Sequence, residues 1–158
     1  MSNFFEKTDI SRKEAENIIS DTLQKCDDGE LYLENSKSES IILDDNKIKN
    51  SSYNSDLGFG FRAISDEIVA YSHSNEISKN SLKQSSENLR STLKSAKGAY
   101  NHSIPKSNKK YYENINPIEQ KSLNEKIKIL NDVNKYIRSK DNNVKQVTAN
   151  FLGEHKSI

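Results

Sequence analysis

The side chains best suited to chemistry, three histidines and one cysteine, are few and far apart in the sequence. His73, His102 and His155 include no pair at the i, i+4 spacing that puts two imidazoles on one helix face, as in H-E-x-x-H zinc sites. Gly153 to His155 reads GEH, which has the right residue types in the wrong arrangement. Cys26 is alone, so there is no C-x-x-C motif. The sequence therefore predicts no metal-binding, cofactor-binding or catalytic residue, and solvent-facing histidines.

Carboxylates are plentiful, but they gather where the chain is predicted to turn. Asp27, Asp28 and Glu30 follow the first predicted helix, and Asp44 and Asp45 lie at a predicted hairpin. Acidic residues are common in such turns for conformational reasons alone. No G-x-S-x-G elbow is present to activate a serine. These carboxylates are therefore interpreted as turn residues.

The segment DLGFGFRAIS, residues 56–65, holds two of the five glycines. A dinucleotide-binding loop needs G-x-G-x-x-G between a strand and a helix, but Ala63 takes the third glycine position and another strand is predicted to follow. Strand alternation places Gly58, Gly60 and Arg62 on one face and the neighbouring phenylalanines on the other. The segment therefore predicts a strand that needs small residues.

Composition narrows the possible partners. Twenty-four basic and twenty-three acidic residues give a net charge of +1, which does not favour binding to nucleic acid or to an anionic membrane. No apolar run reaches the roughly 18 residues of a membrane span, and the first residues do not resemble a signal peptide. We therefore expect a cytoplasmic protein, and a buried thiol at Cys26, which lies on the apolar stripe of a predicted helix.

Apolar periodicity predicts three helices. The first begins at a capping box formed by Ser11 and Glu14 and is expected to stop at Gly29. The second begins near residue 78 and is expected to stop at Gly98, and two serines interrupt its thin apolar stripe. The third follows a capping box at residues 122–125. Its predicted stripe consists of Ile127, Leu130, Val133 and Ile137.

Between the first two helices the period changes to two, which predicts strands. They reverse at Asp45 and Asn46 and again at residues 65–67, giving an antiparallel sheet of about four or five strands with helices packed on it, an α+β fold. After the third helix, alternation at Val147, Ala149 and Phe151 predicts one more strand. This strand either joins the first sheet or begins a second, missing domain. The predicted organisation is an N-terminal domain at 1–100, a connector at 101–117, and the start of a truncated central domain at 118–158.

The order of these motifs resembles the N-terminal domain of the TldD branch of the TldD/PmbA family of bacterial metallopeptidases. The similarity extends through DGELYLENSKSESIILDDNKIKNSSYNSDLGFGFRAISDEIVAYSHSNEIS, and its most characteristic part runs from Gly58 through Arg62 to Ser65. Further on, the Asn116-Pro117 start and the helix and strand that follow are similar to the family's passage into its next domain. The family often has glycine after RAIS, where this chain has Asp66, a residue that turns tolerate.

The resemblance implies an enzyme whose catalytic residues belong to another domain. The zinc motif of the family, His-Glu-x-x-x-His with a later cysteine, lies in the C-terminal domain and has no counterpart here. We therefore expect this chain to be inactive by itself and to hold no zinc. The N-terminal domain of the family helps to enclose a cleft that holds an extended peptide through its backbone, and the subunits of the family pair. The implied partners are an extended peptide or another TldD/PmbA subunit.

Two interpretations of the glycine segment are open. Gly58 and Gly60 permit the backbone of a bound peptide to approach, with Arg62 pairing with an acidic group; or the glycines relieve crowding and Arg62 forms a structural salt bridge, which is the favoured interpretation. For the chain as a whole, the first hypothesis is the N-terminal portion of a TldD-like zinc metallopeptidase, contributing cleft and subunit-pairing surface. The alternatives are a free-standing peptide- or subunit-binding module, or a gene remnant without function.

Overall fold

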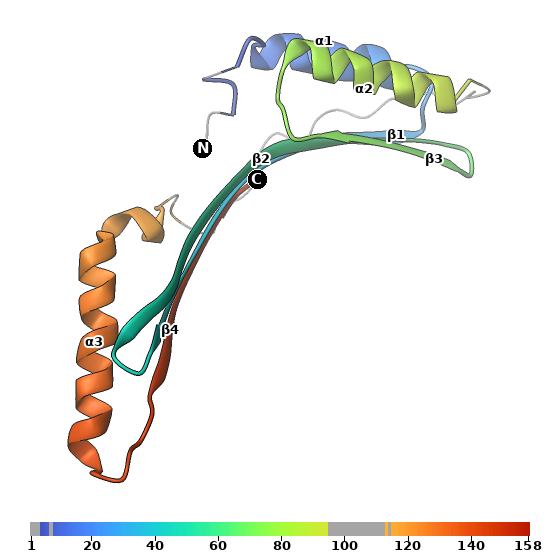
Figure 1. Ribbon diagram of the computed structural model, residues 1–158. Helices are drawn as coiled ribbons and strands as arrows, with labels where there is room; N and C mark the ends of the chain where they lie inside the picture. The colour runs from blue at the N-terminus through green and yellow to red at the C-terminus, as the bar shows by residue number, and fades with distance from the viewer. Residues whose placement is uncertain (1–3, 7, 95–112, 114) are drawn as a thin grey trace. The chain divides into compact units, whose positions relative to one another are not determined.

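The computed structural model, which describes residues 4–6, 8–94, 113 and 115–158, contains both helices and strands (Figure 1). Four strands form one sheet in the order β3-β2-β1-β4, and β2 runs antiparallel to β3. The predicted α+β fold is confirmed. In chain order the elements are α1 (Arg12–Leu23), β1 (Asp28–Asp44), β2 (Lys47–Ser65), β3 (Ile68–Ser74), α2 (Lys79–Thr92), the 3-10 helix η1 (Pro117–Gln120), α3 (Leu123–Lys140) and β4 (Thr148–Ser157).

The chain packs as two units, and β1 and β2 contribute residues to both. Unit 1 comprises the described residues of Met1–Asn35 and Asp56–Asn114, together with Ile158; unit 2 comprises Ser36–Ser55 and the described residues of Ile115–Ser157. Unit 1 therefore contains α1, α2 and β3, whereas unit 2 contains η1, α3 and β4. The predicted domain limits at residues 100 and 118 stay a prediction.

Both predicted chain reversals are hairpin turns. Asp45 and Asn46 have φ values of 47° and 69°, as a two-residue turn with two left-handed positions requires, and Asp66 has a φ of 51°. The strands between the turns are longer than predicted: residues 28–44 and 47–65 each form one continuous strand. The serine- and asparagine-rich middle of each strand lacks apolar alternation, but strand pairing uses backbone groups and therefore continues through it.

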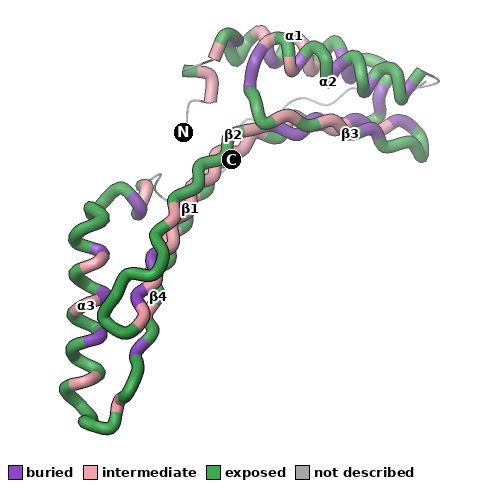
Figure 2. Tube along the Cα trace, viewed as in Figure 1, coloured by how far each residue is buried: buried purple, intermediate pink, exposed green. Residues whose placement is uncertain are grey.

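The core of unit 1 lies between one face of its strands and the helices α1 and α2 (Figures 1 and 2). The two serines predicted to interrupt the stripe of α2 are buried in this layer. Ser86 Oγ lies 2.6 Å from Thr22 Oγ1, and Ser72 Oγ donates to Ser85 Oγ at 3.0 Å, so these hydroxyls are hydrogen-bonded where they are buried. The buried apolar residues are Ile10, Ala15, Leu23, Cys26, Phe59, Phe61, Ala63, Ala70, Ile77, Leu82, Leu89 and Leu93.

Helix α1 begins as predicted and ends earlier. The capping box of Ser11 and Glu14 is present, but the last helical residue is Leu23 and the predicted stop, Gly29, lies within β1. This prediction was wrong: Gly29 does not end the helix but lies in a strand where other residues pack closely against it. A Cβ atom at position 29 would lie 2.3 Å from Leu23 Cδ2 and 2.8 Å from the carbonyl oxygen of Arg62.

The pair of Glu14 and Lys79 predicts how unit 1 responds to acid. Lys79 Nζ donates to Glu14 at 2.8 Å, and this bond, with those from Ser11, holds the pKa of Glu14 at about 2, below its ordinary value of 4.5. A lowered folded-state pKa stabilises the fold above pH 4.5 and loses that effect as pH falls toward 2. We expect urea titrations to show that Glu14→Gln is less stable than the wild type at pH 6, with the difference disappearing near pH 2. The control is Glu87→Gln, at an exposed position of α2; an equal effect there would contradict the assignment.

In unit 2, α3 packs on the strands through a face that differs from the predicted stripe (Figure 2). Its buried residues are Lys126, Leu130 and Asn134, whereas Val133 and Ile137 are exposed, so the prediction was right for Leu130 and wrong for these two. The buried polar residues have distant partners. Asn134 Nδ2 donates to Asn46 Oδ1 at 2.5 Å, and Lys126 pairs with Glu39.

The last strand joins the sheet, which is the first of the two arrangements that the sequence left open. β4 lies beside β1, and the amide of Asp45 donates to the carbonyl of Val147 at 2.9 Å just outside both strands. Whether residues 118–158 begin a further domain stays a prediction. The predicted stop at Gly98 and most of the connector at 101–117 lie outside the described residues. Among the helices that the structure describes, none is long and apolar enough to cross a membrane.

Candidate functional site

The glycine-bearing strand β2 lies inside the sheet. It pairs with β3 on one side and β1 on the other, so the free edge next to it belongs to β3. Gly58, Gly60 and Arg62 lie on the face opposite the buried Phe59 and Phe61, as the alternation predicted. The Nε atom of Arg62 is 3.0 Å from a carboxylate oxygen of Glu30 on β1, an ion pair without hydrogen-bond geometry. Whether these residues serve structure or peptide binding stays a prediction.

Gly58 and Gly60 differ in the kind of atom that an added Cβ would meet. A Cβ atom on Gly58 would lie 2.6 Å from the carbonyl oxygen of Ser74, a backbone atom of the neighbouring strand. A Cβ atom on Gly60 would lie 2.6 Å from the hydroxyl of Tyr71, which is the far end of an exposed side chain. The backbone of β3 cannot move without disturbing its ladder with β2, whereas the exposed side chain of Tyr71 can adjust by rotating about its side-chain bonds. Gly58 is therefore the more constrained position.

This difference predicts unequal effects of the same substitution. We expect Gly58→Ala to lower the free energy of unfolding by about 1–3 kcal/mol, the usual cost of overpacking, because a backbone atom must shift. Gly60→Ala should cost less than about 1 kcal/mol, since strain is relieved by rotation of one side chain. Urea denaturation of both variants measures the two values. A larger effect at Gly60 would contradict the packing described here.

The free edge of β3 exposes three sets of backbone groups. The amide of Asp27 donates to the carbonyl of Ile64 at 2.8 Å, so the polar groups of Ile64 point away from β3. In an antiparallel ladder the partner of such a residue also points its N–H and C=O away from the pair. The partner of Ile64 is Val69, and the alternation continues along β3. The backbone groups of Val69, Tyr71 and His73 therefore face outward at the sheet edge.

The side chains along β3 are also accessible. Val69 and Tyr71 are 59% and 64% exposed, and Ile68 is 43% exposed. The rings of Tyr71 and His73 stack with their centroids 5.8 Å apart. A strand that combines outward backbone groups with exposed apolar side chains can pair with an extended peptide. The sequence left open whether the glycine segment binds a peptide, and only the strand order identifies β3 as the free edge beside it.

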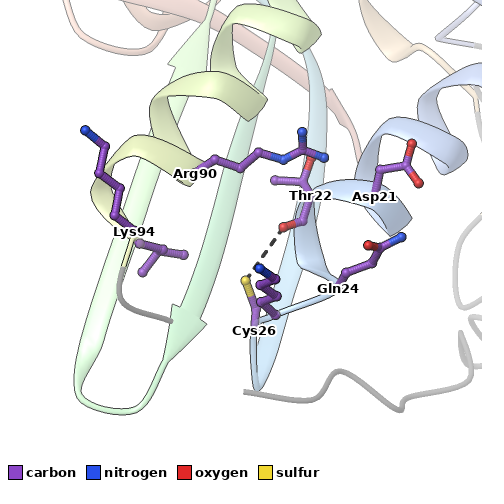
Figure 3. Close-up of a pocket in the computed structure, with 8 residues that line it drawn as sticks. Asp21, Thr22, Gln24, Cys26, Arg90 and Lys94 are labelled. Atoms are coloured by element: carbon purple, nitrogen blue, oxygen red, sulfur yellow. Dashed lines mark hydrogen bonds between the residues drawn. The ribbon is translucent and has the colours of Figure 1, made fainter. Parts of the chain in front are cut away.

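A second candidate region is a hollow at the C-terminal ends of α1 and α2, with a volume of about 360 Å³ (Figure 3). Cys26 lies at its floor, and its Sγ contacts the carbonyl oxygen of Thr22 at 3.8 Å. Burial raises the pKa of the Cys26 thiol, and the neighbouring Asp27 raises it further. The predicted buried thiol is confirmed, and a raised pKa does not favour a nucleophilic role.

The histidines do not come together within the described part of the chain. His73 lies on β3 in unit 1 and His155 lies on β4 in unit 2. His102 falls outside the described residues. Among the side chains that the structure describes, no group of three or more His, Cys, Asp and Glu residues is arranged to hold a metal ion.

Comparison with known proteins identifies the family. Residues 29–99 match the family model of PmbA/TldA metallopeptidase domain 1. The chain is also 33% identical over 136 residues to the metalloprotease TldD homolog of Buchnera aphidicola from Acyrthosiphon pisum. Residues 29–99 thus correspond to the first domain of the TldD/PmbA family. The matched region contains β1, β2, β3 and α2, so the candidate edge at β3 is a feature of this TldD/PmbA first domain.

The relatives in the TldD/PmbA family are much longer than this chain. The match to the first of these Buchnera aphidicola proteins, from subspecies Acyrthosiphon pisum, covers 85% of this chain and 28% of that relative. The TldD homolog of B. aphidicola from Schizaphis graminum is 29% identical over 154 residues, which is 96% of this chain and 32% of the relative. The crystal structure of TldE from Thermococcus kodakarensis has the same fold, with a TM-score of 0.63 at 19% identity over 90% of this chain and 34% of that one.

Proposed function

We propose that this chain forms the non-catalytic N-terminal part of a TldD-type metallopeptidase and holds extended peptide segments along the free edge of β3. The single observation that carries the peptide role is the outward direction of the backbone groups of Val69, Tyr71 and His73. The family match supports the link to peptide substrates, because the relatives are named metalloproteases. In this proposal, zinc and the residues that bind it are supplied outside these 158 residues.

Backbone pairing suits an enzyme that accepts many sequences. The outward N–H and C=O groups of alternate residues on β3 would bond to every second residue of a peptide strand, whatever its side chains. Val69 and Tyr71 would contribute apolar contact beside the peptide, since both side chains are more than half exposed. The same edge would serve pairing with another TldD/PmbA subunit, which competes with a peptide for the same backbone groups.

The decisive variant is Tyr71→Pro, which removes one outward N–H. Because this N–H does not bond to β2, proline should be tolerated in the fold, as it is on edge strands. We expect the wild-type chain to bind a capped alternating valine–threonine peptide of about eight residues with a Kd near 1 mM. Tyr71→Pro should weaken this binding by about tenfold, and the measurement is an NMR titration of backbone amides.

Two controls separate the backbone from the side chain and the fold. Tyr71→Ala keeps the N–H and removes the ring, so it should bind the peptide better than Tyr71→Pro. Ala70→Pro removes an amide that faces β2, and it should unfold β3. Equal binding by Tyr71→Pro and Tyr71→Ala would contradict recognition through the backbone. Peptide hydrolysis by the purified chain that a chelator abolishes would contradict the non-catalytic role.

A further inference from the structure

The hollow at the ends of α1 and α2 carries an excess of positive charge. Lys25, Arg90 and Lys94 line it together with a single carboxylate, Asp21. Arg90 extends from α2 toward α1, whereas Lys94 points away from Arg90 (Figure 3). Among the described residues, none of these four charged side chains has an ion pair or a side-chain hydrogen-bond partner. The charges that line the hollow are therefore not used to hold α1 and α2 together.

The opposite ends of the same two helices are different. There, Lys79 pairs with Glu14 at 2.8 Å and Arg12 pairs with Glu16 at 2.9 Å. Arg12 and Lys79, near the start of the helices, thus have carboxylate partners, whereas Lys25, Arg90 and Lys94 have none in the described part of the chain. The contrast indicates that the charge at the hollow is available to a ligand.

The helix ends and a neighbouring carboxylate offset this charge. Each helix C-terminus carries the equivalent of about half a negative charge, so two of them offset about one positive charge. Three lining cations against one lining carboxylate leave an excess of two, and Asp27, next to Cys26, offsets one more. Recognition of an anion at the hollow therefore depends on the guanidinium of Arg90, which is unpaired among the described residues, and not on a net positive charge.

The floor of the hollow favours an apolar part of a ligand. Thr22 and Cys26 are buried, and the hydroxyl of Thr22 already bonds to the carbonyl of Ile18 and to Ser86. Leu93, which is also buried, supplies apolar lining. The polar side chain at the floor already has hydrogen-bond partners, so an apolar group of a ligand can pack there.

We propose that this hollow binds a small organic anion, with its carboxylate or phosphate group at Arg90 and its apolar part against Leu93 and Cys26. The guanidinium offers paired donors to a planar or tetrahedral oxyanion, which a lysine cannot match. A volume of about 360 Å³ accommodates a ligand the size of a substituted benzene ring. This site is separate from the β3 edge, and it stands whether or not that edge binds peptides.

The test uses the full chain with phenyl phosphate, benzoate and inorganic phosphate as probes. We expect amide shifts at residues 21–26 and 90–94 with phenyl phosphate or benzoate, with a Kd of about 1–10 mM, and weaker binding of inorganic phosphate. Tighter binding of phenyl phosphate than of benzoate would indicate a phosphate site, and the reverse order would indicate a carboxylate site. Sodium chloride at equal ionic strength should not produce the same shifts.

Variants locate the anion. Arg90→Gln should raise the Kd of the aromatic probe by about tenfold. Lys94→Gln should raise it less, because Lys94 points away from Arg90. The matched control, Arg12→Gln, removes a cation from the other end of α1 and should leave binding unchanged. If Arg90→Gln does not fold, Lys25→Gln replaces it. No shift with any probe, equal binding by Arg90→Gln and wild type, or the same shifts with sodium chloride would overturn the proposal.

Discussion

Lys126→Ala is expected to destabilise unit 2 by about 3–5 kcal/mol, the usual cost of leaving one member of a buried ion pair without its partner. The side chains of Lys126 and Glu39 are only 4% and 9% exposed. Nζ lies 2.6 Å from Oε1 and 2.8 Å from Oε2 of Glu39, of which only the second contact has hydrogen-bond geometry. It also donates to the carbonyl of Ile118 at 2.6 Å, so one ammonium group joins α3, β1 and η1.

The measurement is urea denaturation of the wild type and the variant, with amide exchange at Ile41 and Leu43 to follow unit 2 itself. Lys128→Ala, at an exposed position two residues further along α3, is the matched control and should cost less than about 0.5 kcal/mol. Replacing both Lys126 and Glu39 by methionine should recover most of the loss, since it removes the buried charges together. A cost below about 1 kcal/mol for Lys126→Ala would show that the pair is not buried as described.

Phe61→Ala is the second large expected effect, at about 3–5 kcal/mol. Phe61 lies on β2, is fully buried, and belongs to the core between the strands and helices of unit 1. That core is built mainly from aliphatic and small residues, so few side chains are large enough to move into the space of a phenyl ring. Folded domains have about 5–15 kcal/mol of stability, so this single change removes a large part of it.

Leu57→Ala provides the comparison for Phe61→Ala within β2. Strand alternation puts Leu57 on the face of Phe61, but Leu57 is 38% exposed, so its truncation should cost less than about 1 kcal/mol. Urea denaturation midpoints of both variants, analysed with the same m-value, give the difference in their free energies of unfolding. Similar costs at the two positions would contradict the core of unit 1.

Local features of the fold were predictable because their signals lie within a few residues. The capping boxes at Ser11 and Ser122 need only a hydroxyl and a carboxylate three residues apart, and both are present. The turn at Asp45 and Asn46 needs residues that tolerate positive φ, and both adopt it. The family could also be predicted, since the order of such motifs is itself a pattern.

The errors came from partners that are distant in the sequence. Lys126 and Asn134 are polar, so periodicity assigned the buried face of α3 to apolar residues; their partners, Glu39 and Asn46, lie more than eighty residues earlier. Ser86 was taken as an interruption for the same reason, because its partner is on α1. Likewise, the candidate edge depends on strand order, which alternation within β2 could not supply.

The most direct test of the proposed peptide edge is amide hydrogen exchange at β3 with and without the alternating valine–threonine peptide. Without peptide, the amides of Val69, Tyr71 and His73 should exchange rapidly, because they point away from β2. With saturating peptide we expect exchange at these three amides to slow by about tenfold or more, while the amides of Ala70 and Ser72 change little. Unchanged exchange at the three outward amides, with peptide bound elsewhere, would contradict the proposal that this edge holds extended peptides.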